Sequence, residues 1–251
     1  MPRQERFQYL VASDWSECLS PNGPFDPLIH AWPDLESDLG RIFSRYTANE
    51  ISLSRAIEEL QARLPGELPG QAMDAFLEEN FAAYANLSRL IHWCLDRGIA
   101  FMINSTGSMG YFQRALALGL LPRIPLLSAH PFLRYAPEDS DPENIFELHE
   151  IEDKAKNTRA ALNELDIPPH RAAVLGDSGG DGPHFAWAAE KGALRVGINT
   201  KASLESYCAD RGIEINARVG QSYRPGEPRD HEAEARTDLA QVCDILHREL
   251  L

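Results

Sequence analysis

The chain has 251 residues, 43% of them hydrophobic, and a formal net charge of −14 at pH 7. This length and apolar content suit one α/β domain with a modest insertion, and no window of the sequence approaches the length of a membrane span. Because an acidic chain repels phosphate backbones and anionic lipids, we expect neither nucleic acid nor a membrane as a partner.

The first predicted element is an apolar strand over residues 9–13 (YLVAS), which leads directly into Asp14. A short apolar run with polar neighbours is typical of a buried strand. In an open parallel sheet, ligands bind beyond the carboxyl ends of the strands. Asp14 is therefore a candidate site residue.

A helical insertion follows the first strand. Apolar residues recur at helical spacing over residues 35–46 and 57–64, and a third helix is predicted from residue 71 to residue 94, after the breaker LPGELPG. We assign residues 25–95 to this insertion, and residues 1–24 and 96–251 to the α/β core.

Aromatic side chains in the insertion have two interpretations. We expect most of them to pack against other helices, as apolar side chains in amphipathic helices usually do. Two residues of the loop FDPLIHAWPD, which enters the insertion, are better placed to reach a substrate. The packing residues are Phe43, Tyr46, Phe81 and Tyr84, and the candidate contacts are His30 and Trp32.

A second apolar strand, residues 99–104 (IAFMIN), ends in two hydroxyl side chains, Ser105 and Thr106. Further along the chain, the segment IEDKAKNTRAALNEL places Lys154 and Lys156 near the start of a predicted helix. Both features put polar groups next to core elements, where a site can form.

The segment VLGDSGGDGPHF, residues 174–185, carries two aspartates on a glycine-rich turn after an apolar strand. Such a turn is also common without any function, because Asp and Gly favour turns. Since Asp14 ends another strand, however, Asp177 and Asp181 can converge with it. Mg²⁺ prefers carboxylate oxygens and often takes a substrate phosphate as a further ligand, so these three residues predict a magnesium site.

This order of residues, with an aspartate, a Ser/Thr, a lysine and GDxxxD at successive strand ends, resembles the haloacid dehalogenase (HAD) superfamily of aspartyl phosphotransferases. The resemblance spans about residues 7–200, and its most specific part is GDSGGD followed by HFAWAAEKGALRVGI. It implies a Rossmann-like parallel sheet flanked by helices. The helical insertion resembles the small cap of phosphoserine-phosphatase-like members, which closes over the site.

The resemblance implies a role for each site residue. Asp14 attacks phosphorus and forms an aspartyl phosphate. Mg²⁺ is held by Asp14, Asp177 and Asp181 and by the backbone carbonyl of Ser16. A hydroxyl binds the phosphoryl group and a lysine stabilises the charge that develops in transfer.

Two of these assignments stay open. Counting from the strand favours Ser105 as the hydroxyl, whereas the following Gly107 and the helix at Tyr111 favour Thr106. Counting back from the Gly-Asp pair favours Lys154 over Lys156.

Ser16 is the main departure from the superfamily pattern. The superfamily usually reads DxDGT, in which the second aspartate is the general acid and base, whereas this chain reads DWSEC. General acid and base help is worth typically ~10²–10⁴-fold, so serine implies slow turnover or a special substrate. P-type ATPases of the same superfamily carry Thr there and still transfer phosphoryl groups. Glu17 is not expected to replace the acid, because neighbouring side chains on a strand-like path face opposite sides.

We therefore predict a Mg²⁺-dependent phosphatase that acts on a small phosphorylated metabolite. Two alternatives remain: a non-catalytic protein that binds a ligand or partner, and a HAD hydrolase of C–halogen or C–P bonds. The Asp177/Asp181 pair argues against dehalogenation, which needs no metal. Residues 25–98 contain no lysine that could form a Schiff base for C–P cleavage.

Four cysteines without metal-binding spacing, and an N-terminus without an export pattern, predict a cytoplasmic protein. The sequence predicts no oligomeric state.

Overall fold

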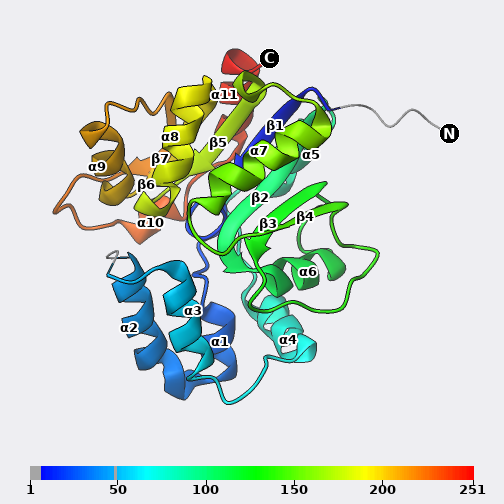
Figure 1. Cartoon of the computed structure of the whole chain (residues 1–251), viewed down its shortest axis with the longest axis vertical. Coiled ribbons are helices and arrows are strands. Elements are labelled where there is room, and N and C mark those ends of the chain that lie inside the picture. Colours follow the sequence, from blue (N-terminus) through cyan, green and yellow to red (C-terminus); the bar gives the residue numbers. More distant parts are fainter. Residues whose placement is uncertain (1–6, 48–49) are drawn as a thin grey trace.

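The computed structural model describes residues 7–47 and 50–251 (Figure 1). Residues 1–6, part of the segment in which we predict no export signal, lie outside the described residues. Within the described residues, seven strands form one parallel sheet in the order β4-β3-β2-β1-β5-β6-β7. The predicted α/β class with a parallel sheet is confirmed.

The strands differ in how well the sequence predicts them. The predicted first strand is confirmed, and the second continues beyond residue 104 through both hydroxyl residues. Three strands near the sheet edges were not predicted, and the two outermost of them are short or polar. The strands are β1 (Tyr9–Ser13), β2 (Ile99–Ser108), β3 (Leu126–His130), β4 (Asn144–Glu147), β5 (Ala172–Gly176), β6 (Leu194–Thr200) and β7 (Ala217–Ser222).

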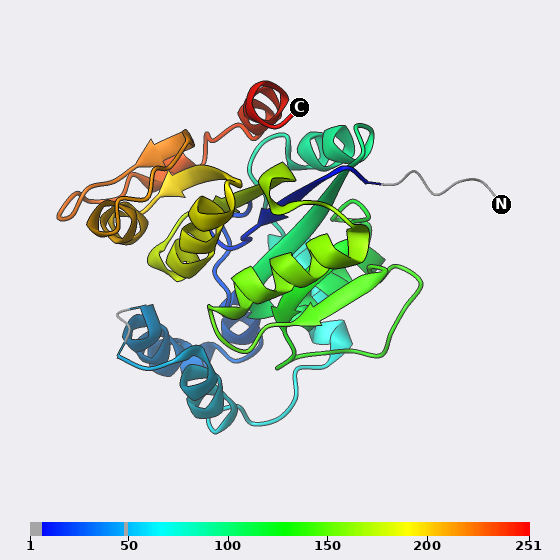
Figure 2. The ribbon, with the colours of Figure 1, turned by 45° about the horizontal axis from the view of Figure 1, so that its top comes forward.

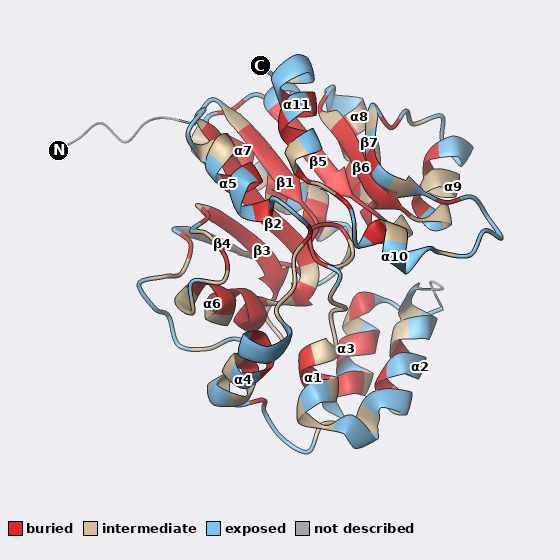
Figure 3. Ribbon diagram, turned by 180° about the vertical axis from the view of Figure 1, so that it is seen from behind, coloured by how far each residue is buried: buried red, intermediate tan, exposed pale blue. Residues whose placement is uncertain are grey.

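Successive strand residues alternate between the two faces of the sheet. Leu10 and Ala12 of β1 pack with one set of helices, whereas Val11 packs with another. Figure 2 shows these two helical layers, and Figure 3 shows the strands buried between them. The first layer contains α7 (Asp153–Leu165), α8 (Gly182–Lys191) and α9 (Ala202–Asp210), and the second contains α5 (Leu87–Leu95), α6 (Met109–Ala117) and α11 (Ala240–Glu249).

Four helices of the insertion lie beyond the carboxyl ends of the central strands (Figure 1). They are α1 (Asp26–Ala31), α2 (Glu36–Thr47), α3 (Leu53–Gln61) and α4 (Gly70–Asn80). Arg114 of α6 pairs with Asp74 of α4 at 2.7 Å, and the N–H of Leu53 donates to Glu150 at 3.0 Å. The first contact joins the insertion to α6, and the second joins it to the segment just before α7.

The single helix predicted over residues 71–94 is wrong, because the chain forms α4 and α5 with an extended segment between them. The N–H of Ala82 donates to the Asn22 side chain at 3.0 Å, and the N–H of Tyr84 donates to the Leu19 carbonyl at 3.0 Å. These long-range bonds outweigh local helix preference. α5 packs against β2 and α11, and the residue at which the cap ends stays a prediction.

The remaining elements lie in connecting segments. They are α10 (His231–Glu234) and three short 3₁₀ helices, Pro33–Leu35, Pro169–Arg171 and Gly179–Asp181. No helix within residues 7–47 and 50–251 is long and apolar enough to cross a membrane.

Candidate active site

The ends of β1 and β5 bring three aspartates together. Asp14 follows β1, and Asp177 and Asp181 follow β5, the neighbouring strand. One carboxylate oxygen from each lies within 4.8 Å of the others, and all three residues are buried. The backbone N–H of Asp14 donates to the Leu175 carbonyl of β5 at 3.0 Å, which fixes the two strand ends relative to each other.

Lys154, on the first turn of α7, completes one half of this acidic cluster. Its Nζ lies 3.0 Å from Asp14 Oδ1 and 2.6 Å from Asp181 Oδ1. The Asn104 side chain at β2 donates to the Lys154 carbonyl at 2.9 Å and so holds α7 in place. Lys156 instead points away and pairs with Asp153 at 2.7 Å.

The acidic turn is stabilised by its own hydrogen bonds. Asp181 Oδ2 accepts the backbone N–H groups of Asp177 at 3.0 Å and Ser178 at 3.2 Å. A Cβ at Gly176 would lie 2.6 Å from the carboxyl carbon of Asp181, so only glycine fits where the strand meets this side chain. Since Lys154 binds the other oxygen, both oxygens of Asp181 are already engaged.

The sequence patterns did not predict the second half of the cluster, which surrounds Asp177. Lys201 Nζ lies 2.6 Å from Asp177 Oδ2 and 2.6 Å from Glu17 Oε2. Arg229, from the segment after β7, holds Glu17 Oε1 at 2.6 Å and pairs with Glu234 at 2.7 Å. Lys201 directly follows β6, so the strand-end rule that found Asp14 points to it once β6 is extended to Thr200.

The conformation of Glu17 also differs from the expectation. Its φ is +61°, a left-handed turn rather than a strand-like path, and its side chain lines the same pocket as Asp14. Lys201 and Arg229 occupy its two oxygens. Burial alone would raise the pKa of Glu17, but these two cations outweigh it and lower the pKa below its usual value. Glu17 is therefore a paired carboxylate with no proton to donate.

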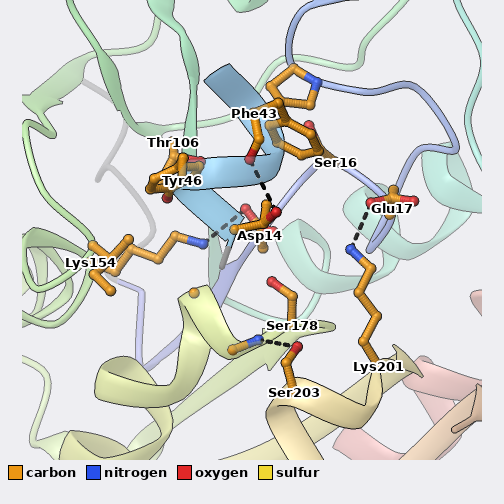
Figure 4. Close-up of a pocket in the computed structure, with 15 residues that line it drawn as sticks. Asp14, Ser16, Glu17, Phe43, Tyr46, Thr106, Lys154, Ser178, Lys201 and Ser203 are labelled. Atoms are coloured by element: carbon orange, nitrogen blue, oxygen red, sulfur yellow. Dashed lines mark hydrogen bonds and ion pairs between the residues drawn. The ribbon is translucent and has the colours of Figure 1, made fainter. Parts of the chain in front are cut away.

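The two candidate hydroxyls differ in position. Thr106 lines the pocket with Asp14, whereas Ser105 is buried and its Oγ accepts the N–H of Gly107 at 3.2 Å. Gly107 lines a smaller neighbouring cavity. Ser16, with no carboxylate to offer, faces the main pocket beside Asp14 (Figure 4).

The pocket lies between the strand ends and α2 (Figure 4). Phe43 and Tyr46 of α2, expected as packing residues, both line it. Phe43 also packs edge-on against Phe25, with ring centroids 5.6 Å apart. Phe43 therefore contributes both to packing in the insertion and to the pocket wall. Neither His30 nor Trp32 lines this pocket, and His30 instead contacts the ring of Phe76.

Two histidines near the site, His130 at the end of β3 and His184 in α8, have structural partners. His130 Nδ1 accepts the N–H of Phe132 at 3.0 Å, and His184 Nε2 lies 2.9 Å from the Thr158 hydroxyl. Burial lowers the pKa of His130 to about 4 and, together with Lys154, that of His184 to about 3. Both are neutral near pH 7, and neither lines the pocket at Asp14.

The electrostatics of the cluster fit a bound cation. Burial raises the pKa of Asp14 although Lys154 opposes the shift. Burial and the two neighbouring carboxylates raise the pKa of Asp177 well above its usual range, against the effect of Lys201. Burial acts on Asp181 as well, but Lys154 and the backbone donors outweigh it and lower its pKa. Asp177 Oδ1 is buried without a hydrogen-bond partner among the described residues, and a divalent cation would satisfy it.

Comparisons with known proteins find solved structures with the same fold. A phosphoserine phosphatase solved as a phospho-aspartyl intermediate analogue aligns over 95% of this chain and 99% of its own, with a TM-score of 0.65 and 14% identity. A substrate-bound phosphoserine phosphatase covers 80% of this chain and 90% of its own, with a TM-score of 0.61 and 15% identity. A HAD family hydrolase from Salmonella enterica serovar Typhi covers 89% and 70%, with a TM-score of 0.61 and 13% identity.

No protein-family model matches the sequence, and the search of curated proteins finds no match. The chain has the fold of the HAD superfamily. Within that class, its fold is phosphoserine-phosphatase-like. The resemblance in fold that the strand-end residues implied is confirmed.

Proposed function

We propose that the protein is a Mg²⁺-dependent phosphatase that acts on a small phosphorylated metabolite through an aspartyl phosphate on Asp14. The observation that carries this proposal is the position of Asp14. It directly follows the central strand β1, lies 3.0 Å from a buried lysine, belongs to a three-aspartate cluster and lines a pocket. A carboxylate in such a position can act as a nucleophile.

The metal would be held by Asp14, Asp177 and the Ser16 carbonyl. Asp181, whose oxygens are both hydrogen-bonded, would orient Lys154 and the turn and complete the charge of the site. When bound, Mg²⁺ would neutralise charge on the transferring phosphoryl group.

In the first step, the Asp14 carboxylate forms a bond to phosphorus and the bond from phosphorus to the substrate oxygen breaks. Lys154 stabilises the negative charge on the phosphoryl oxygens, and Thr106 donates a hydrogen bond to one of them. The leaving oxygen takes its proton from water, because neither Ser16 nor the ion-paired Glu17 has an acidic proton. Water then attacks the aspartyl phosphate, which releases phosphate and restores the carboxylate.

The pocket walls favour an apolar group on the substrate. Pro24, Phe43, Tyr46 and Ile151 give the pocket an apolar side. Among the described residues that line it, the cations are Lys154 and Lys201, and both already contact carboxylates. A carboxylate on the substrate, in addition to its phosphate, would therefore lack a free cation. An aryl or alkyl group would instead pack against the apolar side of the pocket.

The second candidate function is ligand or partner binding without turnover. It is favoured by the loss of the general acid at Ser16 and by the ion pairs that occupy Glu17. Both functions use the same pocket and metal site, so activity separates them.

The test is hydrolysis of an aryl phosphate and a panel of metabolite phosphates with Mg²⁺ and with EDTA, for the wild type and Asp14→Asn. We expect Mg²⁺-dependent release of phosphate that falls by more than about 10⁴-fold in Asp14→Asn. Full activity in Asp14→Asn would disprove the aspartyl phosphate. No activity in either protein, with Mg²⁺ binding intact, would support the non-catalytic candidate.

A further inference from the structure

Lys201 lies in the pocket and has no role in the mechanism above. Its ammonium contacts Asp177 and Glu17 at 2.6 Å each. Its backbone N–H also donates to the Asp177 carbonyl at 2.7 Å. Both the side chain and the main chain of Lys201 are therefore tied to the aspartate that has the unpartnered oxygen.

A lysine ammonium and a divalent cation compete for one carboxylate. Asp177 offers one oxygen to Lys201, and its other oxygen has no hydrogen-bond partner among the residues that the structure describes. Bringing Mg²⁺ to this carboxylate places two cations within a few ångströms of each other in a buried site, where repulsion is strong. Lys154 does not create the same conflict at Asp177, because it contacts the other two aspartates.

Lys201 has a second carboxylate partner besides Asp177. Its side chain is 22% exposed, compared with 3% for Lys154, and Glu17 is a second carboxylate partner. Arg229 holds Glu17 in place, and Arg229 in turn is held by Glu234. When Lys201 leaves Asp177, it can therefore stay paired with a fixed Glu17.

We propose that Lys201 is a built-in competitor for the metal at Asp177. It neutralises the acidic cluster when no metal is bound, and it must release Asp177 before Mg²⁺ binds with full affinity. Lys201 thereby sets the Mg²⁺ concentration at which the site fills. This inference rests on the proposed function to the extent that Asp177 is a metal ligand.

The experiment measures Mg²⁺ binding by isothermal titration calorimetry, without substrate, in the full chain. We expect Lys201→Met to bind Mg²⁺ at least about tenfold more tightly than the wild type. Lys156→Met, which removes the same charge from the exposed surface of α7, is the matched control and should bind like the wild type. Mg²⁺ should also raise the unfolding temperature more in Lys201→Met than in the wild type, because tighter binding stabilises the folded state more.

A second variant separates contact competition from the general electric field. Glu17→Gln/Lys201→Met removes one charge of each sign, so the net charge is unchanged, and it avoids leaving Glu17 unpaired if the single variant folds poorly. Tighter binding in this double variant supports the proposal. Affinity equal to or weaker than that of the wild type in both variants would overturn it.

An Asp177→Asn variant distinguishes a failure of the competitor role from a failure of the proposed metal site. If Asp177→Asn loses Mg²⁺ binding while Lys201→Met leaves it unchanged, the metal site stands and the competitor role is wrong. If neither the wild type nor any variant binds Mg²⁺, the metal site of the proposed function is wrong, and the competitor role is overturned with it.

Discussion

Lys154 and Lys201 both contact the acidic cluster, but they belong to differently built halves of the site (Figure 4). Lys154 is almost fully buried and pairs with Asp14, which directly follows β1, and with Asp181, which lies in the short 3₁₀ helix after β5. Lys201 is partly exposed and joins Asp177 to Glu17, which a distant segment holds through Arg229. The half around Lys154 is thus the buried half of the site, whereas the half around Lys201 is more exposed and is where we propose that a lysine and a metal ion compete.

If the two halves differ in this way, substitution of Lys154 should have the largest effect on stability and activity. Lys154→Met leaves two buried carboxylates without their shared cation, and breaking such a pair costs about 3–5 kcal/mol of folding free energy. We expect the proposed phosphatase activity to fall to background as well. Lys156→Met, the control on the same helix, should change neither chemical unfolding nor activity. A Lys154→Met protein as stable as the wild type would show that the buried half is not held by this lysine.

A substitution at Ser16, next to Glu17, tests whether a carboxylate there adds general acid and base catalysis to the proposed phosphatase. Ser16→Asp places a carboxylate where the superfamily pattern has its general acid, and we expect kcat on an aryl phosphate to rise about 10²-fold, at the lower end of the usual effect. Ser178→Asp adds the same charge elsewhere in the pocket and should give no gain. A fall in kcat with Ser16→Asp would mean that the Lys201 half tolerates no further carboxylate.

The sequence predicted the three aspartates of the site well because one rule places two of them. Asp14 and Asp177 follow apolar strands, and parallel strands bring such residues to the same edge. Lys201 obeys the same rule, but the polar end of β6, Asn199 and Thr200, concealed it. Arg229 has no such signal, because it lies in a loop whose position depends on the tertiary structure.

The fold likewise contains elements that local sequence patterns predict and elements that depend on tertiary contacts. Central strands and amphipathic helices follow from apolar patterns, whereas the break between α4 and α5 does not. No Gly or Pro interrupts residues 81–86, and the break follows from bonds to residues about 60 positions away. The short edge strand β4 and the polar edge strand β7 likewise depend on their neighbours for pairing.

The pocket wall from α2 gives a smaller effect on specificity. Phe43→Ala removes an aromatic wall opposite the strand ends, and we expect about a tenfold higher KM for phenyl phosphate with kcat little changed. KM for a small aliphatic phosphate should change less. Leu39→Ala, a buried residue of the same helix that does not line the pocket, is the control for a loosened cap. Equal changes in KM for both substrates would mean that Phe43 only supports the cap.

The smallest predicted effect is a pH dependence of stability in the buried half. His184 of α8 is fully buried, and burial together with Lys154 lowers its pKa to about 3. An unfolded histidine has a pKa near 6.5, so the unfolded state binds the proton more readily. The stability contributed by neutral His184 is therefore complete above pH 6.5 and is lost as the pH falls towards 3.

Between pH 7 and pH 5.5, this difference should cost the wild type about 1 kcal/mol of unfolding free energy. His184→Gln keeps a polar group near Thr158 but does not titrate, so the difference between wild type and variant in urea unfolding should shrink by that amount at the lower pH. A difference that is constant over this range would mean that His184 reaches its proton in the folded state, and that the Lys154 half is more open to water than its burial indicates.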